Sequence, residues 1–371
     1  EVYIPDGVAH FLEHKMFEQE NGKNSLDVLM ALGIDANAYT TNDHTAYLFE
    51  CSNKFYEGLD ELMDYVQHPY FTDENVEKEK GIIAQEIKMY DDDPGWRMYI
   101  NAMDCMYKNN PVKLDIAGTV ESISKITPDV LYKCYNTFYN PSNMTMVVCG
   151  DFVPEDLLEE IKKRLVKKEP QGEIKRIYPP KENKINKPYK EDEMEVSMPI
   201  FAIGYKDNEE LKENRENIIK KHIAIEILLN IAIGKSSDLY KELYESGDLL
   251  AEPDLDYEFS DEYAHVLISG QSTNPKKIYE KVKETFEKYK QDGLDEEHFN
   301  RIQRKIYGDY VVEYNSVGDI ARMFLSDKMK QINSFDYIEE YFQVTKEYTE
   351  DVLKNVFKTE NMILSVVKCK Q

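Results

Sequence analysis

Two histidines and a glutamate stand close together near the start of the sequence, in the pentapeptide His10-Phe11-Leu12-Glu13-His14. In a helix, positions four apart share one face, so His10 and His14 would project side by side with Glu13 next to them. Neutral imidazole is a preferred ligand of Zn²⁺. A carboxylate beside the metal, but not bound to it, can take a proton from water in metal-assisted hydrolysis. The pentapeptide therefore predicts half of a hydrolytic zinc site.

The order of these residues is H-x-x-E-H, the inverse of the commoner H-E-x-x-H order of zinc peptidases. We expect a helix here that Asp6 caps and that Val8, Phe11 and Leu12 anchor through an apolar side. The alternative interpretation is a solvated helix with stray histidines. A zinc site requires a third ligand from elsewhere in the chain.

The next elements are predicted from their composition. Ser25 is expected to cap a helix that Gly33 closes. Residues 36–41 and 45–51 are expected to be strands joined by a turn, and a further helix is predicted from about Phe55 to Val66.

His44 and His68 fall in predicted loops, with no second ligand at a fixed spacing. We therefore favour no metal role for either.

A long helix is predicted to begin at Thr72 or Asp73. Glu79 and Glu86 are two turns apart on one face of this helix, and a carboxylate there could complete a site with two histidines. The alternative is an ordinary charged helix surface.

These motifs together resemble the family of pitrilysin, insulin-degrading enzyme and mitochondrial processing peptidase. The resemblance rests on His-Phe-Leu-Glu-His, on Asn37-Ala38, and on two glutamates seven residues apart. It implies that His10, His14 and Glu86 bind Zn²⁺, that Glu13 is the catalytic base, that Glu79 supports the catalytic site, and that Asn37 and Ala38 bind the substrate backbone. In this family the Asn-Ala strand captures an extended peptide by adding it as an edge strand.

The composition excludes some classes of partner. The chain has 371 residues and a formal net charge of −25, which disfavours nucleic acid and anionic membrane surfaces. The charge would favour cationic peptides, although solubility is the simpler explanation. Five scattered cysteines without a C-x-x-C pair indicate reduced thiols and a cytoplasmic protein. Only nine residues precede the motif, so we expect an upstream segment with further strands that this sequence does not include.

The second half of the sequence echoes the first, which indicates a duplicated domain. Segment 22–26 recurs at 234–239, and segment 143–148 recurs at 361–367. We place the zinc-bearing domain at 1–182 and its non-catalytic homologue at 183–371. The resemblance implies an α+β fold in which each domain has a mostly antiparallel sheet with helices packed on one face, the pair forming half of a clam-like chamber.

Segment 139–151 resembles the family's strand that returns to the sheet, and 167–189 is expected to be a polar linker or domain-edge segment. In the second half His222 matches His10, but Ile225 matches Glu13 and Glu226 matches His14. One histidine cannot hold a catalytic zinc, so this copy is predicted to be chemically empty.

The sequence also departs from the family pattern. Active single-chain relatives carry an Arg and a Tyr, seven apart, that hold the scissile carbonyl, and here these positions fall on Tyr244 and near Ala251. The resemblance therefore implies a heterodimer with a homologue that supplies the Arg/Tyr pair, with a homodimer as the second choice.

The predicted function is a zinc endopeptidase acting on short or unfolded peptides. The alternative is a non-catalytic peptide-binding or scaffold subunit with a vestigial zinc site.

Overall fold

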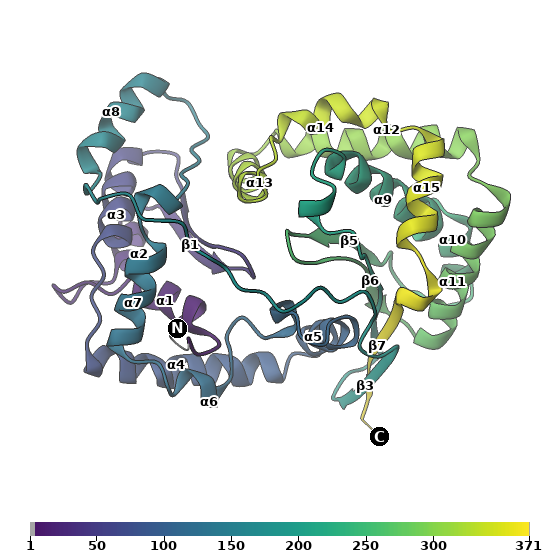
Figure 1. Ribbon diagram of the computed structural model, residues 1–371, viewed down its shortest axis with the longest axis horizontal. Helices are drawn as coiled ribbons and strands as arrows, with labels where there is room; N and C mark the ends of the chain where they lie inside the picture. The colour runs from purple at the N-terminus through teal and green to yellow at the C-terminus, as the bar shows by residue number, and fades with distance from the viewer. Residues whose placement is uncertain (1–3, 371) are drawn as a thin grey trace. The chain divides into compact units, whose positions relative to one another are not determined.

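The computed structural model describes residues 4–370, and Figure 1 shows their helices and strands in chain order. Contacts within the chain group it into two compact units. The first contains the residues up to Met89, Leu114–Arg176 and Ile320–Leu325. The second contains Tyr90–Lys113, Ile177–Asp319 and the residues from Ser326 onward. Each unit therefore includes a segment from the opposite half of the sequence.

The first unit is built on an antiparallel hairpin of two strands surrounded by helices. In the hairpin register Asn37 pairs with Leu48 and Ala38 with Tyr47. Its elements are α1 (Val8–Lys15), α2 (Ser25–Ala31), β1 (Asp35–Thr40), β2 (Thr45–Glu50), α3 (Phe55–Gln67), α4 (Asp73–Asp91), α6 (Val120–Ile123), α7 (Pro128–Phe138) and α8 (Pro154–Arg164). Phe11, Leu29 and Ile83 are fully buried in its core, so α1, α2 and α4 each contribute an apolar side.

The second unit is built on a five-stranded sheet in the order β3-β7-β4-β6-β5. Only the β3–β7 pair is parallel. Its elements are α5 (Pro94–Met106), β3 (Tyr189–Met194), β4 (Ile200–Lys206), α9 (Ile218–Ile233), α10 (Asp238–Glu245), β5 (Asp254–Phe259), β6 (Ala264–Gln271), α11 (Pro275–Asp292), α12 (Glu296–Glu313), α14 (Phe335–Glu340), α15 (Lys346–Val356) and β7 (Met362–Cys369). Helix α13 (Val317–Met329) is divided between the two units.

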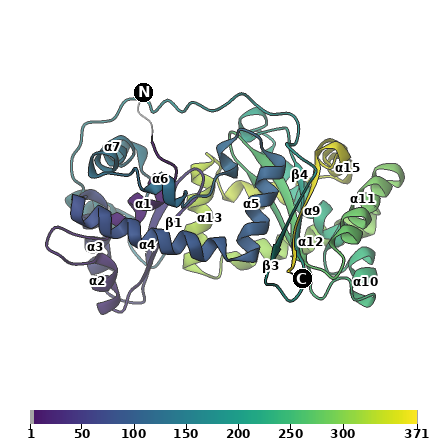
Figure 2. The same cartoon turned by 90° about the horizontal axis from the view of Figure 1, so that it is seen from below.

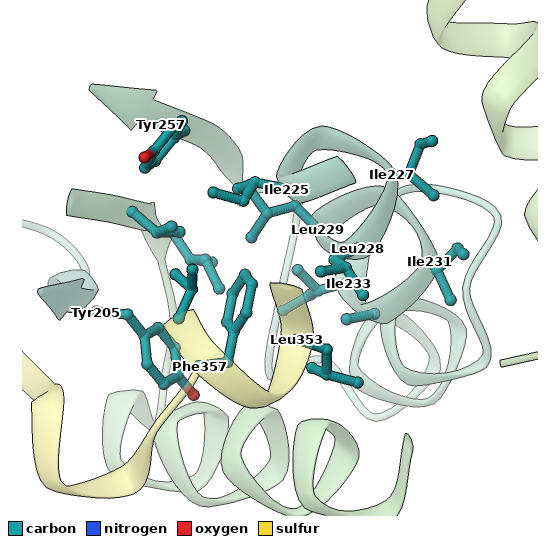
Figure 3. Close-up of a cluster of buried hydrophobic side chains, with 14 of the residues drawn as sticks. Tyr205, Ile225, Ile227, Leu228, Leu229, Ile231, Ile233, Tyr257, Leu353 and Phe357 are labelled. Carbon is teal, nitrogen blue, oxygen red and sulfur yellow. The ribbon is translucent and has the colours of Figure 1, made fainter. Parts of the chain in front are cut away.

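Both faces of the five-stranded sheet are covered. On one face, Tyr205 and Phe357 pack with the apolar side of α9, as Figure 3 shows for Ile225 and Leu228. On the other face lies α5, visible beside β3 and β4 in Figure 2, where Met103 and Met106 pack against sheet residues such as Ile363. Strand β4 is apolar almost throughout because it is buried on both sides.

The predicted α+β class and duplication are confirmed by the order of the elements. The series α1-α2-β1-β2-α3-α4-α5 recurs as α9-α10-β5-β6-α11-α12-α13. β1 begins at residue 35 and β5 at residue 254, while α7 begins at residue 128 and α15 at residue 346. The duplicated halves thus keep the same order of secondary structure although their sequences have diverged.

The prediction of a strand within 139–151 is wrong. Residues 144–149 have no strand assignment, and Met144 and Met146 are exposed. A strand requires a neighbour for its backbone N–H and C=O groups, and in residues 4–370 β1 and β2 pair only with each other. The corresponding strand of the second half, β7, has β3 and β4 on its two sides.

Among the described helices, none is both long enough and apolar enough to cross a membrane.

Candidate metal centre

Helix α1 presents its two histidines on one side and buries the other. Phe11 and Leu12 are almost completely buried, and the rings of His10 and His14 lie side by side with centroids 4.5 Å apart. The predicted Asp6 cap is wrong, because the N-cap is Gly7, which has no side chain to cap the helix. Gly7 has a φ of 89°, and a Cβ atom there would lie 2.4 Å from the carbonyl oxygen of Ala117. The chain enters α1 through a close backbone approach that only glycine permits.

Helix α4 supplies the glutamates. The predicted cap at Thr72 is confirmed, since its hydroxyl accepts a hydrogen bond from the backbone N–H of Asn75. Val76 and Ile83 are buried against the core. Their spacing fixes the rotation of α4 so that Glu79 and Glu86 face the histidines of α1.

The structure brings His10, His14 and Glu86 together. One potential ligand atom from each lies within 4.8 Å of the others, and no other such group of three occurs in residues 4–370. Nε2 of His10 is 3.7 Å from Oε1 of Glu86, and Nε2 of His14 is 3.5 Å from Oε2. The predicted ligands, 72 residues apart in sequence, therefore meet on adjacent helices.

These separations fit a small metal ion. They are too long for hydrogen bonds, and Oε2 of Glu86 is buried without a hydrogen-bond partner among the described residues. Two ligand atoms bound tetrahedrally at about 2.1 Å from one Zn²⁺ would lie about 3.4 Å apart. Two imidazole nitrogens and a carboxylate oxygen are also the donor types of catalytic zinc sites.

Glu79 orients His14. The Nδ1–H of His14 donates a hydrogen bond of 3.1 Å to Oε1 of Glu79, which leaves Nε2 as the ligand atom. On its far side Glu79 faces the ammonium group of Lys15, which is 3.7 Å from Oε2. Lys15 is fully buried and also forms an ion pair with Glu18. The role of Lys15 was not predicted from the sequence, because a lysine next to the motif is expected to be exposed to solvent.

The surroundings shift the pKa values of the two histidines and of Glu79 in different directions. Burial lowers the pKa of His10, and the neighbouring His14 lowers it further. Burial opposes protonation of His14 as well, but the hydrogen bond to Glu79 and the nearby carboxylates outweigh this and raise its pKa. Burial would raise the pKa of Glu79, yet its contacts with His14 and Lys15 lower it, so this carboxylate stays charged.

Glu13 lies next to the cluster without belonging to it. Its carboxylate is largely buried and accepts a hydrogen bond from the hydroxyl of Thr40 at the end of β1. Burial raises its pKa, against the effect of that hydrogen bond. Thr40 thus fixes the orientation of the carboxylate, a role that the sequence did not reveal.

Asn37 and Ala38 lie on β1 beside the candidate centre. Both line a pocket of about 410 Å³ together with Glu13, His14 and Glu79. The strand pairs only with β2 among the described strands, so its other edge offers backbone groups to an added peptide strand. The predicted ligands, base and substrate-binding residues are therefore neighbours in the first unit.

The remaining histidines of the first unit lie outside the cluster. His44 is held in its turn by Asp43 and Thr41, and His68 is exposed and faces Asp64.

The corresponding place in the second half carries a different polar network. His222 on α9 bonds to the hydroxyl of Tyr337 at 2.8 Å, and its Nε2 is 3.7 Å from Glu226. Burial lowers the pKa of His222 to about 3 and raises that of Glu226 to about 7. The imidazole of His222 is neutral and bonded to a tyrosine, and the carboxyl of Glu226 is readily protonated. Both properties fit a structural role.

In the Glu226→Gln variant, the free energy of unfolding should fall less than in the parent as the pH rises. The raised pKa of Glu226 means that its favourable contribution is fully present below its ordinary value of 4.5 and is lost as pH rises through about 7. Because 35% of its side chain is accessible, solvent screening should limit the loss to about 1 kcal/mol. Urea unfolding at about pH 5.5 and about pH 8.5 measures this difference.

The exposed Glu313→Gln variant on α12 is the matched control, with the parent's pH dependence. Equal pH slopes in the Glu226→Gln variant and the parent would contradict the assignment.

Comparison with known proteins places both halves in one family. Residues 4–120 match the profile described as Insulinase (Peptidase family M16), and residues 125–306 match the profile described as Peptidase M16 inactive domain. His10, His14 and Glu86 all fall in the first matched segment.

Relatives with related names cover nearly the whole chain. The uncharacterized zinc protease YmfH of Bacillus subtilis is 36% identical over 370 residues, which are 99% of this chain and 85% of YmfH. A putative M16-like peptidase from Alicyclobacillus acidocaldarius, whose crystal structure is known, is 33% identical with a TM-score of 0.93, over 100% of this chain and 88% of that chain. A protease from Helicobacter pylori shares the fold, with 20% identity and a TM-score of 0.83 over 99% of this chain and 90% of that chain.

Proposed function

Since the chain belongs to peptidase family M16, the insulinase family, we propose that it is a zinc-dependent endopeptidase that cleaves short or unfolded peptides in an enclosed chamber. The observation that carries this proposal is the convergence of His10, His14 and Glu86, with Glu13 beside them. The name "zinc protease" of its B. subtilis relative supports the same chemistry.

Each residue of the centre has a different proposed role in hydrolysis. His10, His14 and Glu86 would hold Zn²⁺, which when bound polarises a peptide carbonyl and lowers the pKa of water. Glu13 accepts the proton of the attacking water and passes it to the leaving amine. Its raised pKa suits it to return that proton, and Thr40 keeps its carboxylate aimed at the reacting groups. Glu79 supports the centre by fixing the tautomer of His14.

The edge of β1 provides the substrate site. The backbone of Ala38, whose N–H donates to the side-chain oxygen of the neighbouring Asn37, would pair with an extended peptide on this edge, which gives affinity with little demand on its sequence. A folded protein cannot offer such a strand, so flexible peptides are the proposed substrates.

The five cysteines are all free, which supports a reducing, cytoplasmic location.

The test combines metal content with cleavage. The purified chain is loaded with zinc, analysed for zinc per chain, and assayed on an unstructured peptide before and after a chelator. We expect one zinc per chain and activity that the chelator removes and added zinc restores. Peptide binding without cleavage by the zinc-loaded protein, alone and with a copurifying homologue, would favour the alternative, a non-catalytic binding subunit with a vestigial site.

We further propose that the chain is the zinc-bearing subunit of a processing-peptidase-like heterodimer. Tyr244 and the region of Ala251 stand where the family's Arg/Tyr pair is expected, and Tyr244 is 55% exposed. A donor aimed at the developing oxyanion contributes about a hundredfold or more in rate.

Adding a homologue that carries the Arg/Tyr pair should therefore raise kcat about a hundredfold. The zinc-loaded chain is assayed alone and after mixing with a copurified homologue. A variant of that homologue lacking the Arg is the control. Full activity of the isolated chain, unchanged by the homologue, would contradict the heterodimer and favour a homodimer with another residue as clamp.

A further inference from the structure

The pocket beside the candidate metal centre has a composition that the hydrolytic role does not explain. Its volume of about 410 Å³ lies within the usual range for ligand pockets, about 300–1,000 Å³. Its lining includes Glu13, His14 and Glu79 of the candidate centre and Asn37 and Ala38 of β1. A side chain entering this pocket from a peptide on β1 would belong to a residue that flanks the scissile bond.

Three large apolar residues are among those that line the pocket. Phe17 is 93% buried and is fixed by ring contacts with Tyr47 and Tyr65. Leu26 and Ile82 also line the pocket, and Ile82 is 47% exposed. Aliphatic or aromatic parts of a substrate side chain would gain free energy by covering Leu26 and Ile82.

Two lysines from different elements line the same pocket, Lys23 from the loop before α2 and Lys78 from α4. Both are exposed, and their ammonium groups have no ion pair or hydrogen bond within residues 4–370. Both lysines thus bring uncompensated positive charge to the pocket of a chain whose net charge is −25.

The acidic residues of the pocket are already engaged. Glu18 forms an ion pair with Lys15, Glu79 contacts His14 and Lys15, and Glu13 accepts the hydroxyl of Thr40. The Thr40 hydroxyl is neutral and does not compensate Glu13 at the candidate metal centre. Apart from Glu13, Lys23 and Lys78 are the lining residues whose charge has no ion pair among the described residues. The charge of these two lysines is opposite in sign to the net charge of the whole protein, which alone would favour basic peptides.

We propose that this pocket selects the substrate residue on one side of the scissile bond, and that Lys23 and Lys78 make it prefer acidic over basic side chains. Glutamate fits both features, because its methylene groups can cover Leu26 and Ile82 while its carboxylate reaches the lysines. Lysine or arginine would meet two like charges there. The inference rests on the proposed peptidase function and assigns its substrate class.

The test uses peptides that differ only in having Glu, Gln or Lys at one position flanking the cleaved bond, which mass spectrometry of the products first locates. At one flanking position, kcat/KM should follow the order Glu, Gln, Lys, with a Glu/Lys ratio of about tenfold that shrinks at high salt. In the Lys23→Glu/Lys78→Glu double variant the order should invert.

Lys88→Glu is the matched control, because Lys88 is exposed on α4 and does not line the pocket. It carries the charge change of one of the two pocket substitutions and should keep the parent's ratio. An unchanged ratio in the double variant, or an equal change in Lys88→Glu, would overturn the proposal.

Binding separates this inference from the proposed function. The same peptides are titrated against the Glu13→Gln variant, which should bind without turnover, and against that variant carrying both lysine substitutions. A Glu preference in binding that the lysine substitutions abolish supports the pocket even if no peptide is cleaved. Cleavage with no charge preference at either flanking position would leave the peptidase function standing and refute the pocket assignment.

Discussion

Glu13→Gln is expected to lower kcat for peptide cleavage about a thousandfold while one zinc per chain remains bound. The carboxamide cannot accept a proton, so the attacking water loses its base and the leaving amine its acid. The substitution preserves shape, and the Thr40 hydroxyl can donate to the carboxamide oxygen as it does to the carboxylate. The geometry of the centre should therefore survive the loss of its proton carrier.

The measurement is kcat at saturating peptide together with zinc content of the same sample. Glu20→Gln is the control, because Glu20 is exposed and does not line the pocket beside the metal centre. It should retain the parent's rate. A Glu13→Gln variant that holds zinc and cleaves at a near-normal rate would exclude Glu13 as the base.

The helix spacing of the motif could be predicted from sequence because it is local. Residues four apart on α1 must share a face, whatever surrounds the helix. Glu86 is different: helical periodicity placed it on a face with Glu79, but only the family resemblance singled it out from the other glutamates of α4. The structure brings it to the histidines through the packing of Val76 and Ile83, which composition alone does not determine.

Tertiary burial explains what the sequence did not reveal. Lys15 is buried because Glu18 and Glu79 neutralise it, and Glu79 comes from a helix 58 residues further along the chain. Strand β3 has the sequence Tyr-Lys-Glu-Asp-Glu-Met, which has little strand propensity, and it forms because it adds to the edge of β7. The residues next to Lys15 or within β3 do not indicate these contacts, because Glu79 and β7 lie far away in the sequence.

Helix α5 shows the same limit at the level of the fold. Its sequence is amphipathic, and the apolar side with Met98, Ala102 and Met106 is buried. It does not say that the helix joins the unit formed mainly by the second half, where it packs on Ile363 and Val367. Amphipathic spacing specifies that a face is covered, but not by which sheet.

Glu86→Gln is expected to weaken zinc binding by at least about a hundredfold, because it replaces one of three proposed protein ligands with a neutral amide. Glu79→Gln should weaken it less, about tenfold to a hundredfold, since Glu79 acts through His14. Glu77→Gln is the control on the same helix, because Glu77 is 70% exposed and pairs with Lys80. Its zinc affinity should equal that of the parent.

Competition with a chromophoric chelator measures the zinc affinity of all four proteins independently of activity. The order Glu86→Gln, Glu79→Gln, Glu77→Gln, from weakest to tightest, follows from the geometry: Glu86 faces both Nε2 atoms, Glu79 faces only Nδ1 of His14, and Glu77 faces neither histidine. If Glu86→Gln retained zinc as tightly as the parent while Glu79→Gln lost it, the third ligand would be Glu79. The side of His14 that binds the metal would then be Nδ1, and the roles of the two glutamates would be exchanged.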